Sequence, residues 1–182
     1  FSIVQPGKTS KYYGFTEQEV KALCAENDMD FELMKHAYDG YIIGDQKSMF
    51  NPNSVMQAIE FRSYDSFWSK TASFMAIESY LNIDADQVRT KILRMMNCEE
   101  VVIEPASFRN DMKNIETSDD VFTLLAHLGY LSYNPETQTV RIPNTEVGAE
   151  FKNAVRAAGW KEMSKAVGQS LQLLEDTINL RK

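Results

Sequence analysis

The sequence predicts a mainly α-helical protein with a minor β component. Apolar residues recur at steps of three and four along several segments, which is the period of an amphipathic helix. Signals for helix starts precede these segments, and pairs of short apolar runs flank polar turns, as in β-hairpins. The chain has 182 residues, of which 43% are hydrophobic, and this is enough for one or two small domains with a buried core.

A helical, lid-like bundle is predicted for residues 14–98, after a linker or arm at 1–13. Thr16 and Glu19 have the spacing of a capping box, in which each satisfies a free backbone N–H at the start of a helix. A second short helix is expected to end at Gly40, because glycine readily adopts the left-handed conformation found at helix ends.

A small β-hairpin is predicted near 41–50, where two apolar runs flank a polar Gly-Asp-Gln-Lys-Ser turn. Asn51 and Pro52 should begin the next helix, since the fixed φ of proline suits the first helical turn. Two further helices are expected at 72–82 and 84–97. The hairpin therefore interrupts a region that is otherwise helical.

The pattern over residues 99–145 is typical of a winged-helix-like module. A run rich in β-branched residues predicts a strand at its start. Thr117 or Ser118 is expected to cap a helix with two acids in its first turn, where the helix dipole favours negative charge. Two runs that alternate about an Asn-Pro-Glu-Thr turn predict a two-stranded wing near 130–142. Helices are expected over 146–182.

Charge and cysteine content exclude several classes of protein. The net charge is -7 and there is no run of Lys and Arg, so binding to nucleic acid through this chain is disfavoured. Cys24 and Cys98 lack metal-type spacing and are interpreted as reduced, buried residues of a cytoplasmic protein, although spacing alone does not exclude one disulfide. No apolar run approaches the ~20 residues needed to span a bilayer.

Five short motifs occur in order along the chain. They read Gly-Phe-Thr-x-x-Glu-Val, Tyr-Asp-Gly-Tyr, Phe-Asn-Pro-x-Ser-Val, Gly-Tyr-Leu and Ile-Pro-Asn-x-Glu-Val, at Gly14–Val20, Tyr38–Tyr41, Phe50–Val55, Gly129–Leu131 and Ile142–Val147. Through them the chain resembles the predicted AAA-ATPase-like family of bacterial and archaeal proteins, over roughly residues 14–151. Departures are Phe50 and Ile42, where the family often has Tyr and Arg, and the segment around Trp68, which keeps only the Trp and a Thr of the usual pattern.

The resemblance implies a place in a longer protein. Family members have a P-loop ATPase core, then a helical region, then a PD-(D/E)XK nuclease-like domain. This sequence contains neither a Gly-x-x-x-x-Gly-Lys-Ser/Thr motif nor the nuclease signature. We therefore interpret the chain as an excised part without catalytic residues, metal site or cofactor of its own. ATP and Mg²⁺ are implied for the parent protein only.

The implied function is that of a non-catalytic lid or coupling region. Its partners would be its own ATPase core and the downstream nuclease-like domain, and residues 146–182 would lead to the latter. The alternative is a winged-helix module for protein–protein or nucleic-acid interaction that acts without ATP. Neither the substrate nor the oligomeric state can be read from the sequence.

Nine residues of the family-like segments are candidates for contacts between domains. They are Tyr38, Asp39, Gly40, Tyr41, Asn51, Pro52, Trp68, Pro143 and Asn144. Tyr38–Tyr41 could contact nucleotide or a neighbouring domain, but we favour a helix stop and turn with packed tyrosines. Asparagine and proline at the other sites are first of all helix-junction residues. The resemblance also implies a phosphate-contacting lid arginine, for which the candidates are Arg62, Arg89, Arg94 and Arg109, although most helix arginines are solvated.

Overall fold

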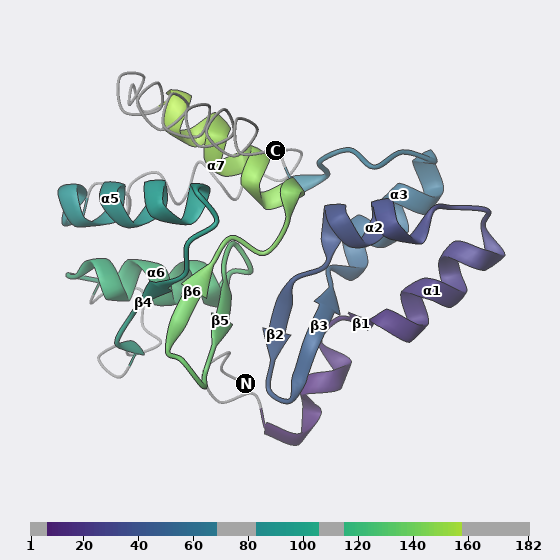
Figure 1. Cartoon of the computed structure of the whole chain (residues 1–182), viewed down its shortest axis with the longest axis horizontal. Coiled ribbons are helices and arrows are strands. Elements are labelled where there is room, and N and C mark those ends of the chain that lie inside the picture. The colour runs from purple at the N-terminus through teal and green to yellow at the C-terminus, as the bar shows by residue number, and fades with distance from the viewer. Residues whose placement is uncertain (1–6, 69–82, 106–114, 158–182) are drawn as a thin grey trace, which may run out of the picture.

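The structure is a computed structural model that describes residues 7–68, 83–105 and 115–157, and these form two lobes (Figure 1). The first lobe is residues 7–68, and the second lobe is the remainder. The described residues are mainly helical, with two small three-stranded antiparallel sheets, which confirms the predicted mainly α class. The helix expected at 72–82, the end of the expected C-terminal helices and Arg109 lie outside the described residues.

Helix caps organise the first lobe. In chain order it contains η1 (Gly7–Tyr12), β1 (Phe15–Thr16), α1 (Glu17–Glu26), α2 (Phe31–Tyr38), β2 (Tyr41–Ile43), β3 (Gln46–Phe50) and α3 (Pro52–Phe61). The predicted capping box is confirmed, since the Thr16 N–H donates to Glu19 at 2.8 Å and Thr16 accepts from the Glu19 N–H at 3.4 Å. Part of the expected arm is ordered as η1, a 3-10 helix.

The first sheet has the strand order β1-β3-β2. The predicted hairpin near 41–50 is confirmed as β2 and β3. The two-residue β1 adds a third strand that was not predicted, with Phe15 opposite Phe50. α1, α2 and α3 pack on one core, whose buried members are Val20, Cys24, Met34, Ala37, Tyr38, Phe50, Val55, Ala58 and Phe67.

The second lobe has a similar organisation. In chain order it contains α5 (Ala85–Met96), β4 (Val101–Val102), α6 (Ser118–His127), β5 (Ser132–Asn134), β6 (Thr139–Arg141) and α7 (Thr145–Ala157). The cap predicted at Thr117 or Ser118 is Thr117, which forms a capping box with Asp120. The sheet order is β4-β6-β5. The hairpin predicted near 130–142 is present as β5 and β6, and β4 lies in the run near 99 where a strand was predicted.

The two lobes have separate hydrophobic cores. The second core joins α5, α6, the β4-β6-β5 sheet and α7 through residues that include Val88, Ile92, Phe122, Val140 and Phe151. Residues on both sides of the expected boundary at 98 contribute to the second core, because the apolar stripe of α5 packs on α6.

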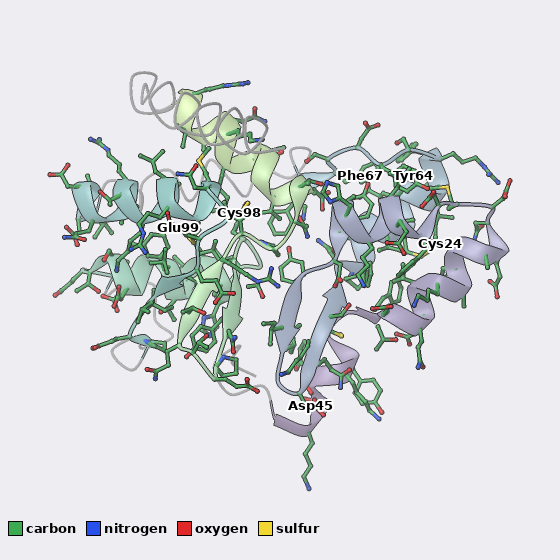
Figure 2. All side chains as sticks on the ribbon, viewed as in Figure 1. Cys24, Asp45, Tyr64, Phe67, Cys98 and Glu99 are labelled. Carbon is green, nitrogen blue, oxygen red and sulfur yellow. The ribbon has the colours of Figure 1, made fainter. Side chains whose placement is uncertain are left out.

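Strands β2 and β5, each at the edge of its own sheet, lie side by side where the lobes meet, and α7 runs across the top of this junction in Figure 1. Both cysteines are free, but the prediction that both are buried is wrong, because Cys98 is exposed. Cys24 and Cys98 lie in different lobes (Figure 2). Within the described ranges, no helix is long and apolar enough to cross a membrane.

Candidate functional site at the junction of the lobes

The Tyr38–Tyr41 motif meets the Pro143–Asn144 motif at the junction. Gly40 has φ +110°, and a Cβ at this position would lie 2.0 Å from the carbonyl oxygen of Pro143. Only glycine permits both this backbone conformation and this approach. The Arg141 guanidinium also donates to the Gly40 carbonyl at 3.1 Å. Two segments about a hundred residues apart are thus in direct backbone contact.

Asn144 forms one hydrogen bond within the first turn of α7 and another across the junction. Its side-chain oxygen accepts from the Val147 N–H at 3.1 Å, which caps the start of α7. Its side-chain NH₂ donates to the Asp39 carbonyl at 2.9 Å. Thr145 adds a third link, because its hydroxyl donates to the His36 carbonyl at 3.2 Å. The start of α7 is therefore tied to the end of α2.

Asn51 and Pro52 form the corresponding helix start in the first lobe. The Asn51 side chain accepts from the Asn53 N–H at 3.0 Å, and Pro52 occupies the first turn of α3. The Asn51 N–H approaches the Tyr38 carbonyl at 3.4 Å. These contacts agree with the interpretation of Asn51 and Pro52 as helix-junction residues.

The two motif tyrosines are buried and each donates to a backbone carbonyl. Tyr38 donates to Asp65 at 2.9 Å within the first lobe, and Tyr41 donates across the junction to Gly129 at 2.8 Å. Burial raises the pKa of both phenols, so they stay neutral donors at pH 7. A second hydrogen bond joins the lobes, in which the Ile42 N–H donates to the Ser132 hydroxyl at 3.0 Å.

Asp39 turns its carboxylate toward the first sheet. Both carboxylate oxygens lie 2.9 Å from the Ser48 hydroxyl on β3. Burial raises the pKa of Asp39, and hydrogen bonds from Ser48 and from the Gly40 backbone only partly oppose this effect. These partners are local, as the helix-stop interpretation of the motif expects.

A buried carboxylate that was absent from the predicted site residues lies at the centre of the junction. Glu146, which is 4% exposed, accepts from the Ser54 hydroxyl at 2.8 Å and from the Phe67 N–H at 2.8 Å. Phe67, labelled in Figure 2, lies on the segment of the first lobe that passes close to α7. One helical turn further along α7, Glu150 accepts from the Ser66 hydroxyl at 3.0 Å.

The electrostatic state of Glu146 follows from this environment. Burial raises its pKa, while hydrogen bonds from Phe67, Ser54 and Trp68 act in the opposite direction. No ion pair with Glu146 occurs among the residues that the structure describes. Ser54 and Glu146 both fall within the quoted motifs, but nothing in their spacing showed that they would meet.

Trp68 links the first lobe to the second core. Its ring packs edge-on against Tyr130, with ring centroids 4.5 Å apart and an interplanar angle of 64°. A Cβ at Gly129 would meet the indole at 3.4 Å, an ordinary contact, so it is the φ of +83° rather than the packing that favours glycine there. Trp68 therefore has a packing role between the lobes.

Two cavities border the junction. A cavity of about 560 Å³ is lined in part by Asp39, Gly40, Pro143 and Asn144. A second, of about 260 Å³, is lined in part by Tyr41, Asn51, Pro52 and Trp68. Every predicted motif residue except the buried Tyr38 thus lines one of the two cavities.

Of the predicted lid arginines, the three that the structure describes line neither cavity. Arg62 ends α3 and donates to the Asn27 carbonyl at 3.2 Å, and Arg94 pairs with Glu99 at 2.8 Å. Arg89 lies elsewhere on α5. The arginine that lines the larger cavity is Arg141, which was not among the candidates.

The described parts of the chain contain no group of three or more His, Cys, Asp and Glu side chains placed to hold a metal ion. The arrangement at the junction consists of caps, backbone contacts and buried hydrogen bonds, which fix one lobe against the other. No family model, curated protein or solved structure matches this chain.

Proposed function

We propose that this chain is a non-catalytic lid or coupling region of an AAA-type ATPase, which positions the ATPase core against a downstream nuclease-like domain. The observation that supports this proposal is the use made of the motif residues. Tyr41, Gly40 and Asn144 each contact the opposite lobe, and Glu146 ties α7 to the first lobe. The residues that carry the family resemblance thus hold two bodies in one relative position.

Such a junction suits the transmission of a displacement. Most of its polar contacts are buried or half-buried, so separating the lobes by a small amount would leave donors and acceptors without partners, at a cost of roughly 1–3 kcal/mol for each buried group. The lobes would then move together when one of them is displaced. ATP and Mg²⁺ would bind to the core of the parent protein, and this chain would respond to the resulting movement.

The direct test is ATP hydrolysis by the isolated 182-residue chain and by the longer parent protein. We expect no turnover by the chain alone and turnover by the parent. In the parent, Ser54→Ala should reduce turnover while ATP binding is kept, because it removes the hydrogen bond to Glu146 between the lobes and not a contact to nucleotide. Clear turnover by the isolated chain would overturn the proposal.

The second lobe also supports a competing proposal, a winged-helix interaction module. The sheet order β4-β6-β5, with α6 ahead of the β5–β6 hairpin, is the feature that favours it. However, eight residues of α6 are buried, and its first turn carries Asp119 and Asp120. A helix that reads DNA needs an exposed face, with Lys and Arg available to the phosphates. Binding to duplex DNA at low salt, lost on adding salt, would favour this module over the coupling region.

A further inference from the structure

The larger cavity between the lobes is electropositive in an acidic chain. Its charged lining residues are Lys35 on α2, Lys47 on β3, Arg141 on β6, Lys152 on α7 and a single acid, Asp39. With His36 neutral, the lining carries a net charge of +3, whereas the whole chain carries -7. Cations from four separate elements therefore surround one cavity.

Neighbouring acids leave much of this charge uncompensated. Lys47 pairs with Glu136 at 3.6 Å, but both side chains are more than 70% exposed, so the pair is weak. Lys35 pairs with Glu17 at 3.1 Å. Arg141 donates to a neutral carbonyl, and in the described ranges neither it nor Lys152 forms an ion pair. Two cations are thus available to an anion.

The rest of the lining is apolar, and it includes Met95, Met96, Ile142 and Pro143. Methionine side chains adapt their shape and make favourable contacts with aromatic rings. The volume of about 560 Å³ lies within the usual range for sites that bind small molecules, roughly 300–1,000 Å³. An inorganic anion alone would leave most of this space unfilled.

We propose that this cavity binds a small organic phosphate of about the size of a nucleoside diphosphate. The phosphates lie against Arg141 and Lys152, since a guanidinium binds phosphate through paired hydrogen bonds and an ammonium adds a point charge. The ring lies against Met95 and Met96. This site goes beyond the coupling role and does not depend on it, because every residue that it needs belongs to this chain.

Calorimetric titration of the chain at low salt with ADP, pyrophosphate and adenosine distinguishes the contribution of the phosphates to binding from that of the ring. ADP should bind most tightly, pyrophosphate more weakly and adenosine weakest. Lys152→Gln and Arg141→Gln should each weaken ADP binding by about tenfold. Lys152 is exposed, so its replacement leaves the fold intact even if Arg141→Gln disturbs the Gly40 contact. Lys21→Gln, which removes a lysine of α1 outside the cavity, is the matched control.

Cys98 provides a second measurement, because this exposed thiol lines the same cavity while Cys24 is buried. Bound ADP should slow alkylation of Cys98 several-fold, and the protection should be lost in Lys152→Gln. The proposal is overturned if ADP gives no protection, if Lys152→Gln and Lys21→Gln bind ADP equally well, or if polyglutamate binds and ADP does not.

Discussion

The Ser54 hydroxyl donates a 2.8 Å hydrogen bond to the Glu146 carboxylate, and the two residues are 92 positions apart in the chain. Both side chains are buried, at 0% and 4% exposure. Ser54 lies in the first turn of α3 and Glu146 in the first turn of α7, so the bond joins the starts of two helices from different lobes. The N-terminal end of a helix favours a negative charge, which helps α7 to hold a buried carboxylate.

Ser54→Ala should destabilise the protein by about 1–3 kcal/mol, because the buried Glu146 carboxylate loses one of its hydrogen-bond donors. The measurement is the free energy of unfolding from urea denaturation followed by circular dichroism. The slope of the transition should not change, since the mutation alters one contact and not the extent of the fold.

Ser63→Ala is a suitable control for this variant. Ser63 follows α3 and is half-buried, so the same atoms are removed at a position away from Glu146. Its effect should be within about 0.5 kcal/mol of zero, as for most substitutions away from buried polar networks. Equal losses for the two serine variants would show that the bond to Glu146 contributes nothing specific.

Glu146 should make stability depend on pH. Because burial raises its pKa in the folded protein, the folded state holds the proton more tightly than the unfolded state does. Its stabilising contribution is therefore complete below the unfolded pKa and is lost as the pH rises through the folded value. Glu146→Gln removes this titration, so the free energy of unfolding of the variant, relative to the unmodified protein, should rise from pH 4.5 to pH 7.5.

The comparison is made by denaturation at several pH values, with Glu136→Gln as the control. Glu136 is 72% exposed, and its replacement should give a difference that hardly varies with pH. If the difference in free energy of unfolding between Glu146→Gln and the unmodified protein does not vary with pH, Glu146 has the same pKa in the folded and unfolded states.

Asn144 combines two roles that two substitutions can separate. Asn144→Ser keeps a side-chain oxygen for the Val147 N–H but loses the donor to the Asp39 carbonyl, which should cost about 0.5–1.5 kcal/mol. Asn144→Ala loses the cap as well, which should add about 0.5–2 kcal/mol. Thermal or urea denaturation would measure both. Equal losses for Ser and Ala would show that the cap does not contribute.

Local signals predicted much of the fold. The capping box at Thr16, the cap expected at Thr117 or Ser118 and the start of α3 at Asn51 depend on residues within three or four positions of one another, and each is confirmed. Both hairpins were predicted for the same reason. The strand β4 falls in the run near residue 99 where β-branched residues predicted a strand. The strand β1 was not predicted, because it is only two residues long and depends on pairing with β3, which sequence alternation could not reveal.

The junction could not be predicted in the same way. The motif residues were singled out, but their partners lie in the other lobe, as with Tyr41 and Gly129 or Asn144 and Asp39. The contact of Glu146 with Ser54 needs both lobes in place, and a lone glutamate at a helix start reads as a solvated acid. The same applies to Arg141, whose position in the cavity follows from how the β5–β6 hairpin docks beside β2.

Gly40→Ala should be the most damaging small substitution at the junction. A Cβ would lie 2.0 Å from the Pro143 carbonyl oxygen, and the atom it meets is backbone, which cannot rotate away. In addition, φ of +110° is unfavourable for alanine.

Gly7→Ala separates the two effects, because Gly7 also has a positive φ, of +66°, but its Cβ would meet nothing within 4 Å. We expect a loss of about 1–2 kcal/mol for Gly7→Ala, from backbone strain alone. Gly40→Ala should lose clearly more, since the lobes must also separate at Pro143. Urea denaturation of the two variants tests this, and a similar loss for both would show that the lobes are not held in close contact at Gly40.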